Sequence, residues 1–458
     1  MRQNMVHCAN ADRHMSHKVR DRNTILLCPG PEYLFWALGV YFAWELSRNY
    51  RVVLIADHCF VDVERVQGLV SAGVLHDFLQ YPAYQNSFLG IGKAYSRHRY
   101  FKRLAEEVFT RYSVAAVVQH TDLEPSNIYL FRKAASENCL RVMYHSSAVA
   151  KDYYEDNMWL YNWAIAVLQK ELGTWRHLAV VLFNTRRISS YYFNYWLMPL
   201  LLTGWLFRPR IGPLLQLAPV FNGNPGYFDS AIIYSIREKS ITEANGVLSD
   251  VVQNPLFTCG NDANNYLFPG VTEKAQIIVL PTSAEFDQFF PSVNGTEQEY
   301  IKLYASIWAE AISVIQKQFP GHATFIKCHP MGMDDAIFDE VIIQLDGLGC
   351  YASKINNSES AEKCILESTV IVGTMSSTLW WASELQLQNT VISLDLWNIT
   401  GGDKCSEVGD ILYVKTMAGL RAMDFSKRPT DDSHKAAFPT LTAHIKQKYA
   451  EQFIKHVL

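Results

Sequence analysis

A stretch near the C-terminus, Ser368-Thr369-Val370-Ile371-Val372-Gly373-Thr374-Met375-Ser376-Ser377, decides the fold. Its apolar first half predicts a short buried strand, and the residues that follow it, 378–385, have a helical pattern. The succession of strand, helix and strand at 24–57 predicts a βαβ unit, and therefore a parallel sheet. Hydroxyl and backbone N–H groups at the helix start favour an anion such as a phosphate, although Ser-Ser before a helix is also an ordinary N-cap.

A second motif, Lys327-Cys328-His329-Pro330, lies upstream. It ends an apolar run, 323–326, that predicts another buried strand, which Pro330 would stop. A cationic His and a Ser pair, each at the carboxyl end of a strand, would face the crevice where open α/β sheets bind ligands. Together they predict a nucleotide diphosphate or monophosphate as leaving group, whereas His-Pro taken alone is more often a turn.

The same alternation of strands and helices occurs in both halves of the chain. Further strands are expected at 24–28, 51–57, 113–120, 140–145, 276–280 and 390–394, with helices at 33–46, 127–135 and 296–318. The turn at Gly30 lacks the G-x-G-x-x-G pattern, so no dinucleotide fingerprint is present. The predicted fold class is α/β, with two Rossmann-like domains facing a cleft and an aromatic-rich helical insertion between them.

The composition sets limits on the function. The chain has 458 residues, 49% of them hydrophobic and 19% charged, with a net charge of −4, which gives no case for nucleic-acid binding. The nine cysteines contain no C-x-x-C and no Cys/His cluster at zinc spacing, so we expect reduced, buried thiols in a cytosolic compartment and no metal site. Residues 1–23 have no apolar core typical of a signal peptide.

The insertion is rich in aromatic residues. Residues 188–207 carry no charge and are flanked by Arg186, Arg187, Arg208 and Arg210. This segment predicts an interfacial or acceptor-binding element, because amphipathic rings favour the lipid headgroup level and arginines attract anionic lipid. A helical hairpin buried between domains and a membrane span are the alternatives.

The two motifs resemble the donor-nucleotide half of bacterial sialyltransferases and polysialyltransferases, which carry an HP motif and a downstream SS/ST motif. The resemblance covers about residues 275–394. Capsule Kdo transferases and the glycerophosphotransferases of teichoic acid synthesis have a similar Lys-x-His-Pro and Ser-Ser layout, so the donor sugar is not fixed. Two facing Rossmann-like halves correspond to the GT-B arrangement of glycosyltransferases.

The resemblance also implies residue roles. His329 would assist the leaving group, Ser376 and Ser377 would bind the nucleotide phosphate, and Glu362 would contact the nucleoside. The remaining nucleotide-binding candidates are Lys327, Pro330 and Thr374.

The general base is less clear, because the family's acidic motif ending in Gly is missing. Asp122 and Glu124, after the strand at 113–120, are the best substitutes, although Asp122 could simply cap the next helix. Glu285 and Glu32 are further candidates for this role. No Asp-x-Asp follows an apolar strand, so metal-independent chemistry is expected.

Six segments are expected along the chain, with the acceptor and donor sides assigned from the resemblance. They are a polar N-terminal tail (1–23), an acceptor-side Rossmann-like domain (24–158), the insertion (159–225), a connecting segment (226–271), a donor nucleotide-binding Rossmann-like domain (272–400) and a C-terminal helical segment packing back on the domains (401–458).

The function expected is inverting, metal-independent glycosyl transfer from a CMP-activated sialic-acid-like or Kdo-like donor to a cell-surface glycan or glycolipid acceptor. No cofactor besides the nucleotide sugar is expected. The protein would be cytoplasmic and would contact the inner membrane face through residues 188–210. The alternatives are a nucleotide-sugar 2-epimerase-like isomerase, a teichoic-acid-type glycerophosphotransferase, and a non-catalytic membrane-docked scaffold.

Overall fold

The computed structural model describes residues 22–29, 32–82, 91–120, 125–144, 228–244, 248–281, 296–328, 335–356, 359–374, 376–385, 387, 389–396, 411–425 and 435–457. The chain divides into two compact units. The first comprises residues 1–255 and 437–458, and the second comprises residues 256–436.

The first unit is built on a seven-stranded sheet in the order β3-β2-β1-β4-β5-β6-β7, with all of its strand pairs parallel. Its strands are β1 (Thr24–Cys28), β2 (Arg51–Ala56), β3 (Asp77–Gln80), β4 (Val114–Gln119), β5 (Leu140–Tyr144), β6 (Ser230–Ile233) and β7 (Ser249–Val251). The central strands are continuous apolar runs, as expected where helices cover both faces of a parallel sheet.

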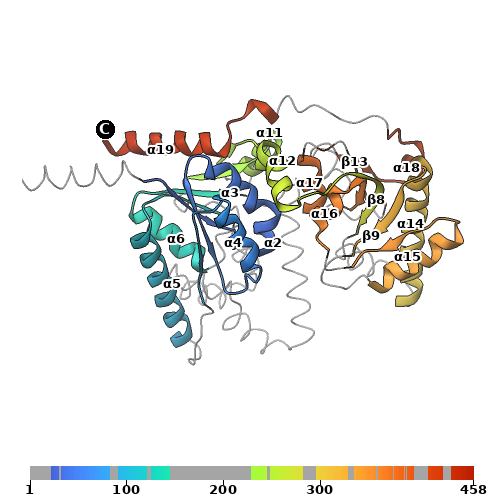
Figure 1. Cartoon of the computed structure of the whole chain (residues 1–458), viewed down its shortest axis with the longest axis horizontal. Coiled ribbons are helices and arrows are strands. Elements are labelled where there is room, and N and C mark those ends of the chain that lie inside the picture. Colours follow the sequence, from blue (N-terminus) through green and yellow to red (C-terminus); the bar gives the residue numbers. More distant parts are fainter. Residues whose placement is uncertain are drawn as a thin grey trace, which may run out of the picture. The chain divides into compact units, whose positions relative to one another are not determined.

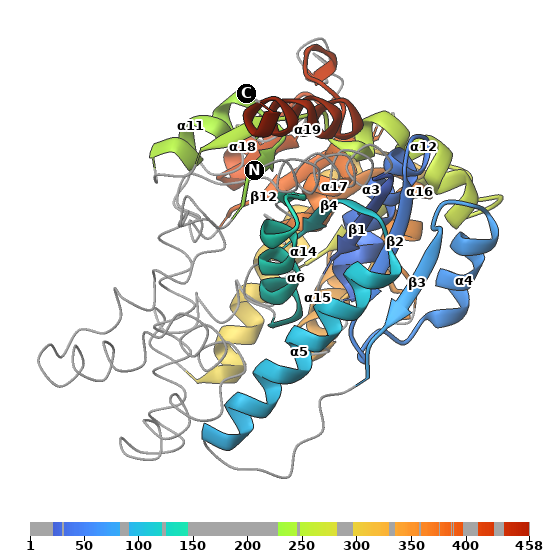
Figure 2. The same ribbon diagram turned by 90° about the vertical axis from the view of Figure 1, so that its left-hand side faces the viewer.

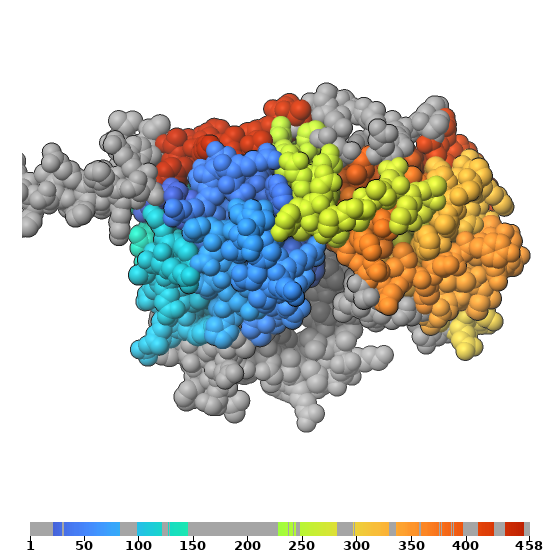
Figure 3. Space-filling model, viewed as in Figure 1, coloured from blue at the N-terminus to red at the C-terminus, as the bar shows by residue number. Residues whose placement is uncertain are grey.

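Helices connect these strands (Figures 1 and 2). They are α2 (Glu32–Leu34), the π-helical turn η1 (Phe35–Gly39), α3 (Val40–Ser47), α4 (Val63–Ser71), α5 (Ile91–Arg111), α6 (Pro125–Ser136), α11 (Ile236–Ala244) and α19 (Leu441–Val457). The neighbouring helices α5 and α6 bury Phe101 and Leu130 against Leu26 and Val117 of the sheet. The C-terminal helix α19, drawn in red, packs on α3 and β5 of this unit (Figures 1 and 3).

The second unit has a six-stranded sheet in the order β10-β9-β8-β11-β12-β13, again with all strand pairs parallel. Its strands are β8 (Lys274–Leu280), β9 (Ala323–Ile326), β10 (Ser353–Lys354), β11 (Ser368–Gly373), β12 (Thr390–Leu394) and β13 (Ile411–Val414). Its helices are α12 (Pro255–Leu267), α14 (Glu297–Gln318), α15 (Asp335–Gly347), α16 (Ala361–Leu366), α17 (Ser377–Glu384) and α18 (Met417–Ala422), and a 3₁₀ turn, η3 (Lys435–Ala437), follows.

Helix α14 provides much of the second core. Thr296 and Glu299 form a capping box at its start, which satisfies backbone N–H groups that would otherwise have no partner. Trp308 of this helix is fully buried and makes an edge-to-face contact with Phe338 of α15, with 5.8 Å between ring centroids.

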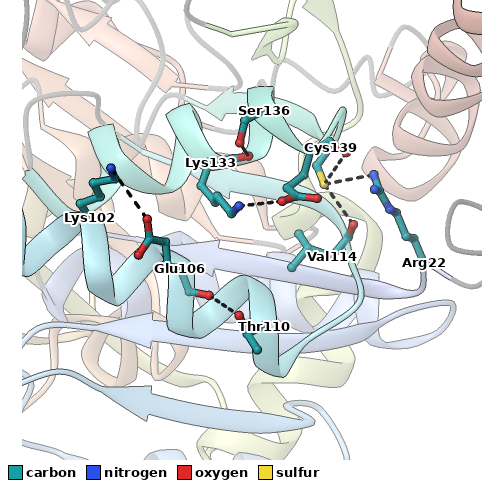
Figure 4. A network of polar contacts seen from close by, with 9 residues as sticks. Arg22, Lys102, Glu106, Thr110, Val114, Lys133, Ser136 and Cys139 are labelled. Atoms are coloured by element: carbon teal, nitrogen blue, oxygen red, sulfur yellow. Dashed lines mark hydrogen bonds and ion pairs between the residues drawn. The ribbon is translucent and has the colours of Figure 1, made fainter. Parts of the chain in front are cut away.

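A network of polar contacts surrounds Cys139, which lies just before the amino end of β5 (Figure 4). The Arg22 guanidinium donates to the Cys139 thiol (3.3 Å), which in turn donates to the carbonyl of Val114 (3.2 Å). Burial raises the pKa of Cys139 to about 11, so this thiol is protonated and inert at neutral pH. Lys133 and Glu137 form an i,i+4 ion pair nearby, at 2.6 Å.

Both sheets have the strand order of a doubly wound Rossmann fold, because each runs outward in one direction from its first strand and then in the other. The prediction of an α/β protein with two Rossmann-like domains is therefore confirmed. The cleft between the two domains stays a prediction.

Two segment predictions are wrong. Residues 226–271 are not a connecting segment, because β6 and β7 extend the first sheet and most of α12 belongs to the second unit. Residues 401–458 are not only helical, because β13 completes the second sheet, and α19 packs with the first unit. The insertion 159–225 lies outside the described residues. Among the residues that are described, no helix is long and apolar enough to cross a membrane.

Candidate functional site

Each sheet has a switch point, where the strand order reverses and ligands bind in doubly wound folds. In the second unit this point lies between β8 and β11. Gly373, the last residue of β11, pairs with Leu280 of β8, and a Cβ atom on Gly373 would lie 2.6 Å from the Leu280 carbonyl oxygen. Only glycine allows this approach without a shift of the backbone, so the two strands end side by side.

Two buried polar residues flank this pair of strand ends. Lys327 follows β9, which neighbours β8 on its other side, and its backbone N–H donates to the carbonyl of Val279 (2.9 Å). Thr374 follows Gly373 directly. Lys327 is 4% exposed and Thr374 is fully buried. A buried lysine is uncommon, and burial of its charge is tolerated where the ammonium group meets hydrogen-bond partners or an anion.

The charge of Lys327 acts on α16, the helix that precedes β11. Burial raises the pKa of the Cys364 thiol in this helix to about 11, and the Lys327 charge acts in the opposite direction. Ser360 caps the start of α16 by accepting from the Lys363 N–H (3.0 Å), and Glu362 lies in the first helical turn. The predicted contact of Glu362 with the nucleoside stays a prediction.

The start of α17 lies at the same edge. Ser376 is the N-cap of this helix, and its hydroxyl oxygen accepts from the Leu379 N–H (3.3 Å). Ser377 is the first helical residue. Ser376 therefore forms the ordinary N-cap that was the alternative to a phosphate-binding role for Ser376 and Ser377. The remaining N–H groups of the first turn, together with the helix dipole, favour negative charge here.

Asp395 belongs to this edge, and sequence reasoning missed it. It follows β12, is 3% exposed, and accepts a hydrogen bond from the Tyr413 hydroxyl (2.6 Å). The only signal in the sequence is a single acidic residue directly after the apolar run 390–394, and a single residue does not form an Asp-x-Asp motif. The structure thus brings Lys327, Thr374, Ser376 and Asp395 to the carboxyl ends of β9, β11 and β12.

The switch point of the first unit lies between β1 and β4. Cys28 and Gln119 pair there at the ends of the two strands, and Tyr144 ends the neighbouring strand β5. Burial raises the pKa of both the Cys28 thiol and the Tyr144 hydroxyl, so both are neutral at physiological pH.

Two of these groups lack hydrogen-bond partners. The side-chain amide of Gln119 and the hydroxyl of Tyr144 are fully buried, and neither has a partner among the described residues. Leaving such groups unpaired costs about 1–3 kcal/mol each, so their presence calls for a physical reason. Uncharged groups of this kind suit a hydroxyl or amide of a neutral ligand, or a buried water molecule.

Several predicted site residues lie outside the described residues. They are His329, Pro330, Asp122, Glu124 and Glu285. Their roles stay predictions. The described residues before these gaps are Cys328 after β9, His120 after β4 and Pro281 after β8. A role as general base does not suit Glu32, because its carboxylate already accepts from the N–H groups of Val61 (2.8 Å) and Asp62 (2.9 Å) and from the Trp36 indole (3.2 Å).

One described cysteine, Cys59, departs from the expected buried pattern and lies in a group of possible metal ligands. Asp57, His58 and Cys59 follow β2, and their ligand atoms all lie within 4.8 Å of one another. Cys59 is exposed, whereas the other described cysteines are buried as expected. The usual zinc motifs have Cys and His residues separated by two or more positions. Here the three residues are consecutive, so no such motif indicates this cluster.

Comparisons with known proteins give structural likenesses of low sequence identity. The UDP-GlcNAc 2-epimerase from Neisseria meningitidis, bound to UDP-GlcNAc, is 12% identical, with a TM-score of 0.48 over 94% of this chain and 100% of that one. The epimerase from Methanocaldococcus jannaschii is 10% identical, with a TM-score of 0.48 over 94% and 99% of the two chains. A glycosyltransferase from Rickettsia africae is 9% identical, with a TM-score of 0.44 over 94% and 99%. No protein-family model and no curated protein matches the sequence.

Proposed function

We propose that this chain is an enzyme acting on a nucleotide sugar, and that its second unit binds the phosphate of the donor at the carboxyl edge of β8, β9 and β11. The observation that carries the proposal is the buried Lys327 at the switch point of a doubly wound sheet, together with the start of α17 at the same edge. A lysine ammonium and a helix N-terminus both stabilise a phosphate, and they do so without a metal ion.

Within this class we propose glycosyl transfer, from a CMP-activated sialic-acid-like or Kdo-like sugar to a glycan or lipid-linked acceptor. Departure of the nucleotide leaves negative charge on its phosphate. Lys327, the hydroxyls of Ser376 and Ser377, and protonated His329 would stabilise that charge as it develops. A carboxylate, for which Asp122, Glu124 and Glu285 are the candidates, would deprotonate the acceptor hydroxyl. The sugar and the acceptor rest on the motif resemblance.

A 2-epimerase is the second candidate function, since the uncharged groups Gln119 and Tyr144 of the first unit would suit the sugar of an epimerase substrate as well as an acceptor. The two reactions differ in their products. A transferase releases free nucleotide in step with acceptor glycosylation, whereas an epimerase inverts C2 of the sugar. NMR of a nucleotide sugar incubated with the enzyme separates these outcomes.

Nucleotide binding is tested by thermal unfolding in the presence of CMP, CDP, UDP and GDP. A ligand present at 100 times its Kd stabilises the folded state by about 2.7 kcal/mol, so the nucleotide that raises Tm most identifies the donor class. The change Lys327→Met should remove most of that rise. The matched control is Lys302→Met, at an exposed position of α14.

The Tm of the Lys327→Met protein without ligand shows whether it still folds. If none of the four nucleotides raises the Tm of the wild type, or if the folded Lys327→Met protein responds as the wild type does, the phosphate site lies elsewhere.

A further inference from the structure

The loop that follows β2 is exposed, yet several hydrogen bonds and aromatic contacts hold it in place. The Gln80 side-chain amide, at the end of β3, donates to the carbonyls of Asp57 (3.1 Å) and Phe60 (2.6 Å). Phe60 is 2% exposed and contacts the rings of Phe35 (5.6 Å) and Phe78 (5.9 Å between centroids). The two carbonyl contacts of Gln80 and the buried ring of Phe60 therefore hold the loop on both sides of His58 and Cys59.

A carboxylate fixes the other end. Glu32 accepts from the backbone N–H groups of Val61 (2.8 Å) and Asp62 (2.9 Å), and its own orientation is set by the Trp36 indole (3.2 Å). Between these supports the side chains of His58 and Cys59 are exposed, and that of Asp57 is partly exposed. The surrounding residues thus hold three polar side chains at the surface.

The three side chains supply the donor atoms that zinc prefers, namely imidazole nitrogen, thiolate sulfur and carboxylate oxygen. The Cys59 sulfur and the His58 Nε2 lie 3.4 Å apart. Two such ligands on a tetrahedral zinc ion would be separated by roughly 3.6 Å, given bond lengths of about 2.3 Å and 2.05 Å. The Asp57 Oδ1 accepts from the Cys59 N–H (2.9 Å), which orients the carboxylate and leaves Oδ2 for a metal.

We propose that Asp57, His58 and Cys59 form a binding site for a divalent cation of the zinc type, with three protein ligands and an open position for water. Thiolate and imidazole donors favour such an ion over Mg²⁺ or Ca²⁺, which take oxygen ligands. The site lies at the carboxyl edge of the first sheet, two strands from β4 in the order β2-β1-β4. Its three residues belong to the first unit, whereas the proposed nucleotide site belongs to the second.

The test uses the full chain, reduced, treated with a chelator and desalted. Co²⁺ serves as a spectroscopic substitute for Zn²⁺, because its bond to a thiolate gives an absorption band in the near ultraviolet. We expect one equivalent of Co²⁺ to produce the band and Zn²⁺ to displace it. The band should vanish in Cys59→Ser, and His58→Ala should bind at least ten-fold more weakly. The control His76→Ala, at an exposed histidine of the same unit, should bind as the wild type does.

Two results would contradict the metal site. A band that persists in Cys59→Ser, or Zn²⁺ affinity that is the same in the wild type and a His58→Ala/Cys59→Ser double variant, would overturn the proposal. Because the altered side chains are exposed, the variants should fold, and their metal-free Tm verifies this.

A second readout follows the thiol itself. Saturating Zn²⁺ should protect Cys59 from alkylation, as mapped by mass spectrometry of its peptide. Alkylation at the same rate with and without Zn²⁺ would instead identify a simple thiol–imidazole pair and reject the metal site.

Discussion

At the scale of single residues, His329 carries the sharpest mechanistic expectation. In the sequence it directly follows Cys328 and is two residues after Lys327 of the proposed phosphate site. We expect His329→Ala to lower kcat by roughly 10²–10⁴-fold, the usual contribution of an acid/base group. The control is His322→Ala, which alters a histidine at the opposite, amino end of the same strand. A folded His329→Ala enzyme with activity within a few-fold of the wild type would remove this residue from the mechanism.

Gly373 tests how closely the two central strands of the second unit approach. The change Gly373→Ala places a Cβ atom 2.6 Å from the Leu280 carbonyl oxygen, so the strands must move apart. We expect the free energy of unfolding to fall by about 1–3 kcal/mol, the usual cost of overpacking. Chemical denaturation measures this change. Gly347→Ala, whose Cβ would meet nothing within 4 Å, is the control and should be close to neutral.

His444 makes stability depend on pH. The imidazole of this α19 residue is 3% exposed, its Nε2 lies within hydrogen-bond distance of the Ser230 hydroxyl (2.9 Å), and that hydroxyl donates to Asp250 (2.9 Å). Burial lowers the pKa of His444, although Asp250 opposes this and Lys448 reinforces it. The unfolded chain, where the pKa is about 6.5, therefore binds a proton more readily than the folded state.

Stability from His444 should thus be complete above about pH 6.5 and be lost as the pH falls below it. The measurement is Tm between about pH 7.5 and pH 5.5. His444→Gln should flatten this dependence relative to the wild type, whereas His76→Gln, at an exposed position, should leave it unchanged. A pH dependence that is identical in all three proteins would contradict the assignment.

At the scale of elements, the attachment of α19 to the first unit depends on a buried carboxylate. Glu45 of α3 is 3% exposed, and its Oε1 accepts from the Thr442 N–H (2.9 Å) in the first turn of α19. This oxygen lies at the start of α19, which is the positive end of the helix dipole. Lys446 adds a hydrogen bond to the Asn49 side chain (2.6 Å).

We therefore expect Glu45→Ala to lower the free energy of unfolding by about 1–3 kcal/mol, because the Thr442 N–H then loses its hydrogen-bond acceptor in a buried environment. Chemical denaturation measures the loss, and limited proteolysis should cut near α19 sooner than in the wild type. Glu107→Ala, on the exposed face of α5, is the control. If both variants unfold at the same denaturant concentration as the wild type, the contact contributes little.

At the scale of the whole molecule, membrane contact through the insertion is the main open prediction. If residues 188–207 dock on a lipid surface, the protein should co-sediment with anionic liposomes. Attraction of about 1 kcal/mol per arginine would add to burial of the aromatic residues. Changing the four flanking arginines to Gln should weaken binding most at low salt, and changing Trp196 and Trp205 to Ser should weaken it at any salt.

A buried hairpin would behave differently in the same experiments. The arginine changes would then have almost no effect, and the tryptophan changes would lower Tm. Wild-type protein that does not bind liposomes, together with unfolding of the Trp196→Ser/Trp205→Ser variant, would reject the membrane prediction.

The sequence by itself determined the parallel sheets and several residues at their edges. Runs such as Val52–Ala56 and Val370–Val372 are local signals, since a strand buried on both faces needs consecutive apolar residues. Lys327, Thr374 and Ser376 could be placed at strand ends for the same reason. Residue type alone is a weaker guide to burial within a helix: Leu303 of α14 is 44% exposed, whereas Trp308 of the same helix is fully buried.

Only the tertiary structure decided which distant segments meet. Strands β6, β7 and β13 are short, and their own sequences give weak signals, but the hydrogen-bonding edge of a neighbouring strand recruits each of them to a sheet. The burial of Glu45, its bond to Thr442, and the unpaired amide of Gln119 likewise depend on residues far away in the chain. Local sequence patterns determine the type of each element and which of its faces is buried. Strand order and polar pairing depend instead on residues that are neighbours in space, and a single sequence does not identify those neighbours.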